Sequence, residues 1–291
     1  MMDAIDFAFL DSGTGGIPYM LELKAKLPDA RCVYLGDTEH FPYGQKGADE
    51  VTACAASVIR RIVDVWHPLA LVVACNTISV TALDSLRALF PSLPIVGTVP
   101  AIRLAARCTR NKRIGLLATN ATVRHPYCAR LISDFASDCE VFSRGDPELI
   151  AFIERRLFTA GREERLAAVR PAVDFFARKG CDTIVLGCTH FTHIAGEFAF
   201  LAGPDVQVVD SRDGVAKQAI RVEREKLRAL ASLKDAPPPA AELPPDESFF
   251  VTSCESPAER EEYQSLCRGF HIPWGGVLEE NKRGHAVQSI D

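Results

Sequence analysis

Short runs of apolar residues alternate along this chain with longer stretches in which apolar residues recur every three or four positions. The short runs predict β-strands at 5–10, 31–35, 69–74, 95–96, 113–117, 140–142, 183–187, 206–209 and 249–253. The longer stretches predict helices at 17–27, 48–66, 79–89, 131–136, 148–158, 163–179 and 213–233, and the tail past Asn281 is predicted to fray. Alternation of this kind is typical of parallel sheets covered by helices.

The alternating pattern starts a second time near residue 113. We therefore predict two similar parallel-sheet α/β domains related by an approximate twofold axis, with the active site in the cleft between them. The first domain comprises 1–98 and 212–291 and includes a proline-rich linker at 235–245, and the second comprises 99–211.

Two of the predicted strands end in the same way. The run LVVACNT at 71–77 and the run TIVLGCTH at 183–190 each lead to a cysteine that is closely followed by a threonine. Ligands of open α/β sheets bind at the carboxyl ends of the strands. A single cysteine after an apolar run is more often a packing residue than a catalyst, but the matching contexts favour a functional pair, Cys75 and Cys188.

Two thiols that face each other across a cleft suit one reaction in particular. A thiol has a pKa of about 8.5, and a helix N-terminus or a nearby cation brings it into the range of a general base. One thiolate removes a proton from a carbon, and the opposite thiol returns one to the other face, so configuration inverts. Asp11 and His190 lie beside the two cysteines and are expected to adjust their protonation. The glycine-rich turn DSGTGG at 11–16 offers backbone N–H groups to an anionic substrate.

Composition narrows the class of protein. With 47% hydrophobic and 24% charged residues the chain is expected to be soluble and globular, and a net charge of −5 gives no reason to expect nucleic acid as a partner. The acidic N-terminus and the lack of a long apolar run predict a cytoplasmic protein without a membrane segment. Ten cysteines without a CxxC pair should be reduced and mostly buried. No spacing demands a metal, and no lysine at a strand end suggests pyridoxal phosphate, so no cofactor is expected.

Five motifs together resemble those of glutamate racemases, within the aspartate/glutamate racemase family. They are DSGTGG at 11–16, FPYG at 41–44, ACNT at 74–77, GTVPA at 97–101 and GCTH at 187–190. The resemblance implies a cofactor-independent interconversion of L- and D-glutamate that supplies D-glutamate for peptidoglycan, by a pair of α/β domains that usually assembles as a homodimer.

The resemblance also implies roles for individual residues. Cys75 and Cys188 would be the acid/base thiols, with Asp11 and His190 assisting. The residues that would hold the substrate are Ser12, Tyr43, Gly44, Asn76, Thr77 and Thr189, and Glu154 matches a carboxylate of the family. Thr119 and Thr122 are further candidates from their position after the predicted strand 113–117. The chain departs from the family pattern at Phe191-Thr192, at Asp146-Pro147 and in the loop 118–122.

Several of these residues also have a purely structural interpretation. Asp11 and Ser12, like Asn76 and Thr77, are good helix-capping residues. Tyr43 would serve as loop packing and His190 as a hydrogen-bonded structural histidine. Glu154, which Arg155 and Arg156 follow, is typical of a solvated helix face.

Other functions remain open at this stage. An aspartate or hydantoin racemase would use the same thiol pair on a different substrate. A binding or regulatory protein of the same fold, for instance one that acts on a topoisomerase, would keep the scaffold without the reaction. A cysteine hydrolase would leave the second cysteine unexplained.

Overall fold

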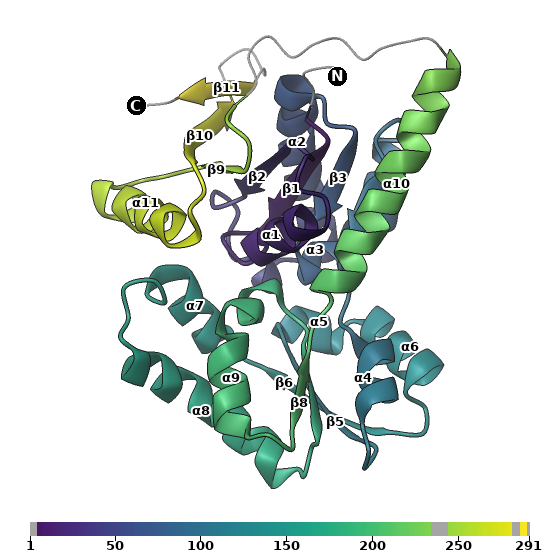
Figure 1. Cartoon of the computed structure of the whole chain (residues 1–291), viewed down its shortest axis with the longest axis vertical. Helices are drawn as coiled ribbons and strands as arrows, with labels where there is room; N and C mark the ends of the chain where they lie inside the picture. Colours follow the sequence, from purple (N-terminus) through teal and green to yellow (C-terminus); the bar gives the residue numbers. More distant parts are fainter. Residues whose placement is uncertain (1–4, 234–243, 281–285, 290–291) are drawn as a thin grey trace. The chain divides into compact units, whose positions relative to one another are not determined.

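The computed structural model describes residues 5–233, 244–280 and 286–289 (Figure 1). The chain divides into two compact units, Met1–Thr98 with Arg212–Asp291, and Val99–Ser211. Each unit contains its own sheet with helices packed on it, so the predicted α/β class with two mainly parallel sheets is confirmed. Most of the predicted proline-rich linker lies outside the described residues.

The first unit contains a seven-stranded sheet in the order β11-β10-β9-β2-β1-β3-β4. Its strands are β1 (Phe7–Asp11), β2 (Cys32–Gly36), β3 (Ala70–Val73), β4 (Ile95–Gly97), β9 (Ser248–Val251), β10 (Trp274–Glu280) and β11 (Ala286–Ser289). All neighbouring pairs are parallel except β10 and β11, which are antiparallel. The prediction of a frayed tail is therefore wrong for 286–289, because β10 offers unpaired backbone groups with which this segment forms a ladder.

Helices cover both faces of this sheet. They are α1 (Ile17–Lys26), α2 (Ala48–Trp66), α3 (Asn76–Leu89), α10 (Arg212–Leu233) and α11 (Pro257–Phe270), with a short 3₁₀ helix η1 (Tyr43–Gln45). Helix α1 lies beside α10, and α2 lies beside α3 (Figure 1). Helix α11 was not predicted from the sequence. It buries only Tyr263, Leu266 and Cys267, so its apolar stripe is too narrow to stand out.

The second unit contains a four-stranded, fully parallel sheet in the order β6-β5-β7-β8. Its strands are β5 (Arg113–Ala118), β6 (Glu140–Gly145), β7 (Thr183–Leu186) and β8 (Gln207–Val209). Its helices are α4 (Ile102–Cys108), α5 (Asn120–Arg124), α6 (Pro126–Phe135), α7 (Pro147–Arg155), α8 (Arg162–Arg178), α9 (Ala195–Ala202) and the 3₁₀ helix η2 (Thr189–Ile194). The sequence predicted neither α4 nor α9, both of which are short.

The same arrangement of four strands occurs in both units. The order β2-β1-β3-β4 in the first unit matches β6-β5-β7-β8 in the second. In each array the chain runs outward in one direction from the first strand in chain order (β1 or β5) and in the other direction from its neighbour (β3 or β7). Open α/β sheets bind their ligands at the carboxyl ends of two such neighbouring strands. Cys75 and Cys188 each stand two residues beyond the end of the third strand, β3 or β7.

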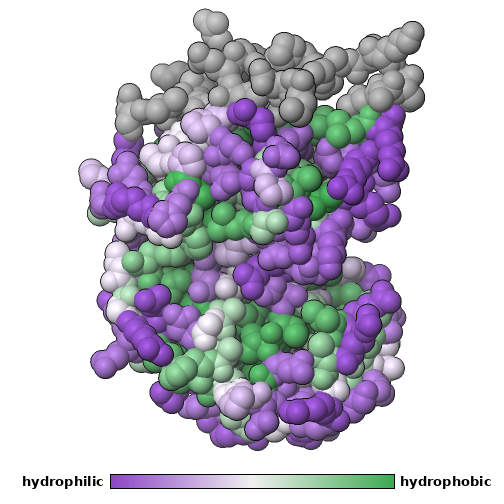
Figure 2. Space-filling model, viewed as in Figure 1, coloured by the Kyte–Doolittle hydropathy of each residue, from purple (hydrophilic) through white to green (hydrophobic). Residues whose placement is uncertain are grey.

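Few large apolar side chains are exposed in the described part of the chain. They are Leu89, Leu104, Phe135, Phe200 and Leu227. Hydrophilic residues occupy the upper right edge in Figure 2, where α10 lies in Figure 1. Within the described ranges, no helix combines the length and apolar character needed to cross a membrane.

Candidate active site

Cys75 begins helix α3 and is buried, with 4% of its surface exposed. It occupies the N-cap position, and its carbonyl oxygen accepts a hydrogen bond from Ser79 N at 2.9 Å. The thiol therefore lies at the carboxyl edge of the sheet and at the amino end of a 14-residue helix. This is the environment that the sequence predicted for it.

Asn76 and Thr77 follow Cys75 in the first turn of α3, and both are buried. Neither amide atom of Asn76 forms a hydrogen bond with any described part of the chain. The interpretation of Asn76 as the helix cap is wrong, because Cys75 occupies that position. A buried amide that the protein leaves unpaired is costly, which makes Asn76 a good candidate for contact with a ligand.

Asp11 ends strand β1, the neighbour of β3, and is fully buried. Its Oδ1 accepts a hydrogen bond from Ser12 N at 2.7 Å. The alternative in which Asp11 or Ser12 caps α1 is wrong, because the N-cap residue is Gly16 and no side chain caps this helix. Asp11 and Ser12 thus lie at the same sheet edge as Cys75.

Tyr43 is buried in η1, and its hydroxyl donates a hydrogen bond to the carboxylate of Asp37. The same carboxylate bonds to His40 Nδ1 at 2.9 Å and accepts a bond from the Thr252 hydroxyl at 2.9 Å. Burial and the Asp37 charge raise the pKa of Tyr43, so this side chain is neutral. The bond to Asp37 raises the pKa of His40. Gly44, in the same 3₁₀ helix, is half-buried.

Asp37 was not among the predicted site residues. It directly follows strand β2, as Asp11 ends β1, and that repeated position was the available signal. Its partner Thr252 lies just beyond β9, more than two hundred residues along the chain, and no sequence pattern pointed to it.

Asp37, Glu39 and His40 place a ligand atom each within 4.8 Å of one another, so this group resembles a metal site. Glu39 is paired with the buried Arg61 at 3.0 Å, which already supplies a positive charge there. Asp37 is engaged by Tyr43, His40 and Thr252. The group is therefore satisfied by its protein partners, and we assign no metal to it.

In the second unit, Cys188, His190 and Glu154 form a continuous chain of contacts. Cys188 Sγ lies 3.7 Å from His190 Nδ1, and His190 Nε2 lies 2.8 Å from Glu154 Oε2. The interpretation of Glu154 as a solvated helix residue is wrong, because only 8% of its side chain is exposed. Burial alone would lower the pKa of His190, but the contacts with Cys188 and Glu154 outweigh it and raise that pKa well above its ordinary value.

The threonines of the second unit have different surroundings. Thr119 caps α5: its hydroxyl oxygen accepts a hydrogen bond from Thr122 N at 3.0 Å and its hydroxyl donates to Thr122 Oγ1 at 2.9 Å. Thr189 is buried in η2, where its carbonyl oxygen accepts a bond from the Thr192 hydroxyl at 2.7 Å. Phe191 and Thr192 differ from the family pattern. The ring of Phe191 is fully buried, and the hydroxyl of Thr192 stabilises η2.

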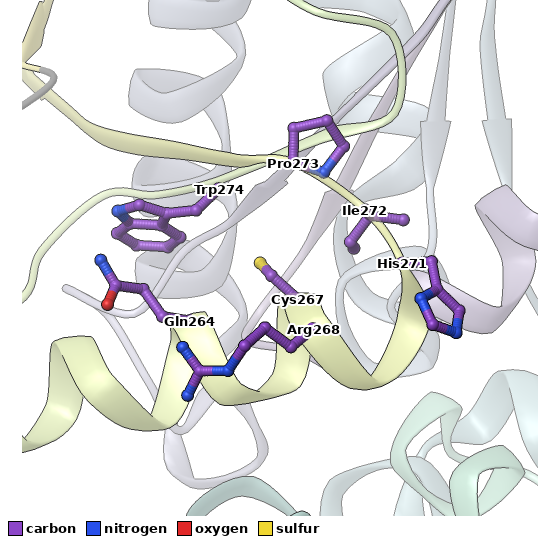
Figure 3. A pocket seen from close by; sticks show the side chains of 7 residues that line it. All are labelled: Gln264, Cys267, Arg268, His271, Ile272, Pro273 and Trp274. Carbon is purple, nitrogen blue, oxygen red and sulfur yellow. The ribbon is translucent and has the colours of Figure 1, made fainter.

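A separate hollow lies in the first unit, between the second half of α11 and the start of β10. Figure 3 shows the side chains that line it: Gln264, Cys267, Arg268, His271, Ile272, Pro273 and Trp274. None of the predicted site residues is among them. The candidate catalytic residues lie at the strand ends and not in this hollow.

The chain is similar to proteins of one known family. Residues 21–219 match the model of the Asp/Glu/Hydantoin racemase family. The chain belongs to that family. Among its curated relatives, a glutamate racemase of Treponema pallidum is 36% identical over 277 residues, which cover 95% of this chain and 98% of that protein. A glutamate racemase of Proteus mirabilis is 37% identical over 78% of this chain and 79% of its own length.

Solved structures of racemases also resemble this one. Escherichia coli glutamate racemase, in complex with L-glutamate and the activator UDP-MurNAc-Ala, aligns with a TM-score of 0.80 at 28% identity, covering 97% of this chain and 99% of that one. The isoform RacE1 from Bacillus anthracis aligns with a TM-score of 0.73 at 26% identity, covering 94% and 98% of the two chains. The two-sheet architecture is therefore that of glutamate racemases.

Proposed function

We propose that this racemase interconverts L- and D-glutamate, with Cys75 and Cys188 as its two acid/base groups and without a cofactor. The observation that carries the proposal is the repeated position of the thiols, each two residues beyond the third strand of a matching four-strand array. The glutamate racemases among its relatives support glutamate as the substrate. Supply of D-glutamate for peptidoglycan is the role that follows from this activity.

The proposed reaction is a pair of proton transfers. One thiolate takes the proton from the α-carbon, and the electron pair left on that carbon then receives a proton from the other thiol, on the opposite face. Configuration inverts, and the two sulfurs exchange protonation states. The enzyme is then ready for the other enantiomer, and it returns to its first state by exchange of the thiol protons with water.

The neighbours of each thiol support these transfers. Protonated His190 supplies a positive charge beside Cys188 when that thiol has lost its proton, and the contact with Glu154 also favours the protonated imidazole. In the first unit, the unpaired amide of Asn76 offers both a donor and an acceptor to the charged groups of glutamate. Asp11 and the turn at 11–16 lie at the same sheet edge as Cys75 and Asn76.

The direct test is incubation of the reduced protein with L-glutamate in D₂O without added cofactor, with L-aspartate in parallel. We expect D-glutamate with deuterium at the α-carbon. Turnover of aspartate alone would assign the protein to another specificity in the family. Turnover of neither amino acid would contradict the proposal and favour a binding or regulatory role.

The two thiols are tested by Cys75→Ala and Cys188→Ala. Each variant should fold and lose racemisation, because each lacks one of the two proton carriers. Cys128→Ala is the matched control, since Cys128 is a buried cysteine of a hydrophobic cluster in the second unit. It should retain the native kcat, and normal racemisation by either single thiol variant would contradict the mechanism.

Homodimer assembly and a cytoplasmic location also belong to this proposal. No disulfide joins any of the ten cysteines, all of which lie in the described part of the chain, and this suits a reducing compartment. Sedimentation analysis of the purified protein tests the dimer, and a monomer with full activity would contradict it.

A further inference from the structure

The hydroxyl of Tyr34 lies directly beneath the glycine-rich turn 11–16. Tyr34 is in the middle of β2, paired in register with Phe9 of β1, and is fully buried. Its hydroxyl donates to Gly13 O at 2.8 Å and accepts from Gly16 N at 2.9 Å, and Asp11 Oδ2 lies 3.4 Å from the same oxygen. One side-chain atom therefore contacts the start, middle and end of the turn.

These contacts engage both the proton and the oxygen of the hydroxyl. A phenol has one proton to donate and accepts on its oxygen. The proton points to Gly13 O, with the Asp11 carboxylate as the more distant acceptor, while Gly16 N–H occupies the oxygen. Because the site is buried, water does not replace these bonds if the hydroxyl is removed.

The turn is also held against the strand that carries Cys75. A Cβ added at Gly16 would lie 2.6 Å from Cβ of Ala74 and 2.9 Å from the Tyr34 hydroxyl, and Ala74 immediately precedes Cys75. A Cβ added at Gly36 would lie 2.7 Å from Gly13 O. The turn thus fits closely between β2 on one side and Ala74 on the other.

We propose that Tyr34 is a positioning residue for the reaction: its hydroxyl fixes Asp11 and the turn 11–16 relative to Cys75. This inference rests on the proposed racemisation at Cys75. Tyr34 acts through its contacts with Asp11 and the turn. Its loss should therefore affect proton transfer at the Cys75 side more than at the Cys188 side.

The test is Tyr34→Phe, assayed with both enantiomers of glutamate carrying hydrogen or deuterium at the α-carbon. Because L- and D-glutamate are equally stable, kcat/KM must fall by the same factor in both directions, and we expect about tenfold. The primary isotope effect on kcat/KM should rise for the enantiomer that Cys75 deprotonates and not for the other. A loss of folded protein alone would lower the rates and leave both isotope effects unchanged, and that result would overturn the proposal.

Tyr263→Phe is the matched control. Tyr263 is a largely buried tyrosine of the same unit whose ring, like that of Tyr34, packs against Phe249, and its hydroxyl donates to Glu259. This variant should have native rates and isotope effects. The same isotope pattern in both variants would also overturn the proposal.

A second substitution covers the case in which Tyr34→Phe does not fold. Incorporation of 4-aminophenylalanine at position 34 keeps a donor for Gly13 O and weakens the acceptor for Gly16 N–H. We expect a smaller shift of the isotope effect in the same direction, and an unchanged effect would count against the role. If the native enzyme itself does not racemise glutamate, the proposed function fails first, which the same assay shows.

Discussion

At the scale of single residues, the most informative contact is the one between His190 and Glu154. The sequence placed His190 beside Cys188 but favoured a solvated position for Glu154. In the structure the two side chains are buried together at 2.8 Å. A carboxylate beside a buried imidazole stabilises its protonated form, so the state of His190 depends on a residue 36 positions away.

Glu154→Gln should shift the pH dependence of racemisation. Cys188 and Glu154 together raise the pKa of His190, and the amide keeps a hydrogen-bonding partner but removes the Glu154 charge. Activity that needs the imidazolium is lost as pH rises through that pKa, so a lower pKa moves the alkaline limb of kcat/KM to lower pH. The measurement is the pH profile of kcat/KM in both directions.

Glu148→Gln is the control for that profile. Glu148 lies on the same helix, α7, but is exposed in its first turn. Its substitution should leave the alkaline limb where it is. An unshifted limb in Glu154→Gln would show that the Glu154 charge does not govern the reaction.

At the scale of elements, the cap of α7 explains one departure from the family pattern. Asp146 occupies the N-cap position, where its carboxylate accepts a hydrogen bond from Leu149 N at 3.1 Å and one from Arg144 Nε at 2.9 Å. The helix that it starts carries Glu154 to His190. Asp146-Pro147 is thus a good helix start, with a capping side chain followed by proline in the first turn.

Asp146→Ala should therefore reduce the free energy of unfolding by about 1 kcal/mol, because it removes the side-chain cap. Asp146→Asn keeps an acceptor for Leu149 N and should lose less. Denaturant unfolding of both variants is the measurement. Equal stabilities of the native protein and Asp146→Ala would show that the cap contributes nothing.

The close approach of β2 to the turn 11–16 leads to a second prediction at this scale. In Gly36→Ala the new Cβ would meet the backbone oxygen of Gly13 at 2.7 Å, so the turn must move. We expect a loss of about 1–3 kcal/mol in stability, as for other overpacked sites, together with a clear loss of racemisation.

Gly214→Ala provides the comparison. Gly214 is an exposed residue of α10 in the same unit, and a Cβ there meets nothing within 4 Å. The substitution should raise stability by about 0.5–1 kcal/mol, because alanine favours the helix, and should leave kcat unchanged. If Gly36→Ala behaved like Gly214→Ala, the turn would not be tightly held.

At the scale of the whole molecule, the central feature is the repeated four-strand array. One chain supplies both thiols at equivalent strand ends. The two units need not be copies in detail to share this property. Asp11 ends the first strand of one array, whereas Thr119, which caps a helix, follows the first strand of the other.

Mixing the two inactive variants tests whether both thiols act from one chain. Cys75→Ala and Cys188→Ala should not restore racemisation when they are co-expressed with different tags and purified together, because each chain still lacks one proton carrier. The measurement is racemisation by the doubly tagged protein. Recovery of activity would mean that one site uses thiols from two copies.

The sequence by itself determined the alternation of strands and helices, the α/β class and the placement of both cysteines at strand ends. These features are encoded locally, in the period of apolar residues and in the polar residues that end each run. Helices α4 and α11 were not predicted, because each buries few residues and its apolar stripe is too narrow to give a clear period. Strand β11 was not predicted either, because it depends on pairing with β10 and not on the apolar pattern of its own residues.

Only the tertiary structure decided which side chains meet. It joined Glu154 to His190, Thr252 to Asp37, and the Tyr34 hydroxyl to the turn 11–16. It also left the amide of Asn76 buried without a partner in the described chain. A hydrogen bond between distant residues depends on where the folded backbone brings them, and no periodicity in the sequence records that position.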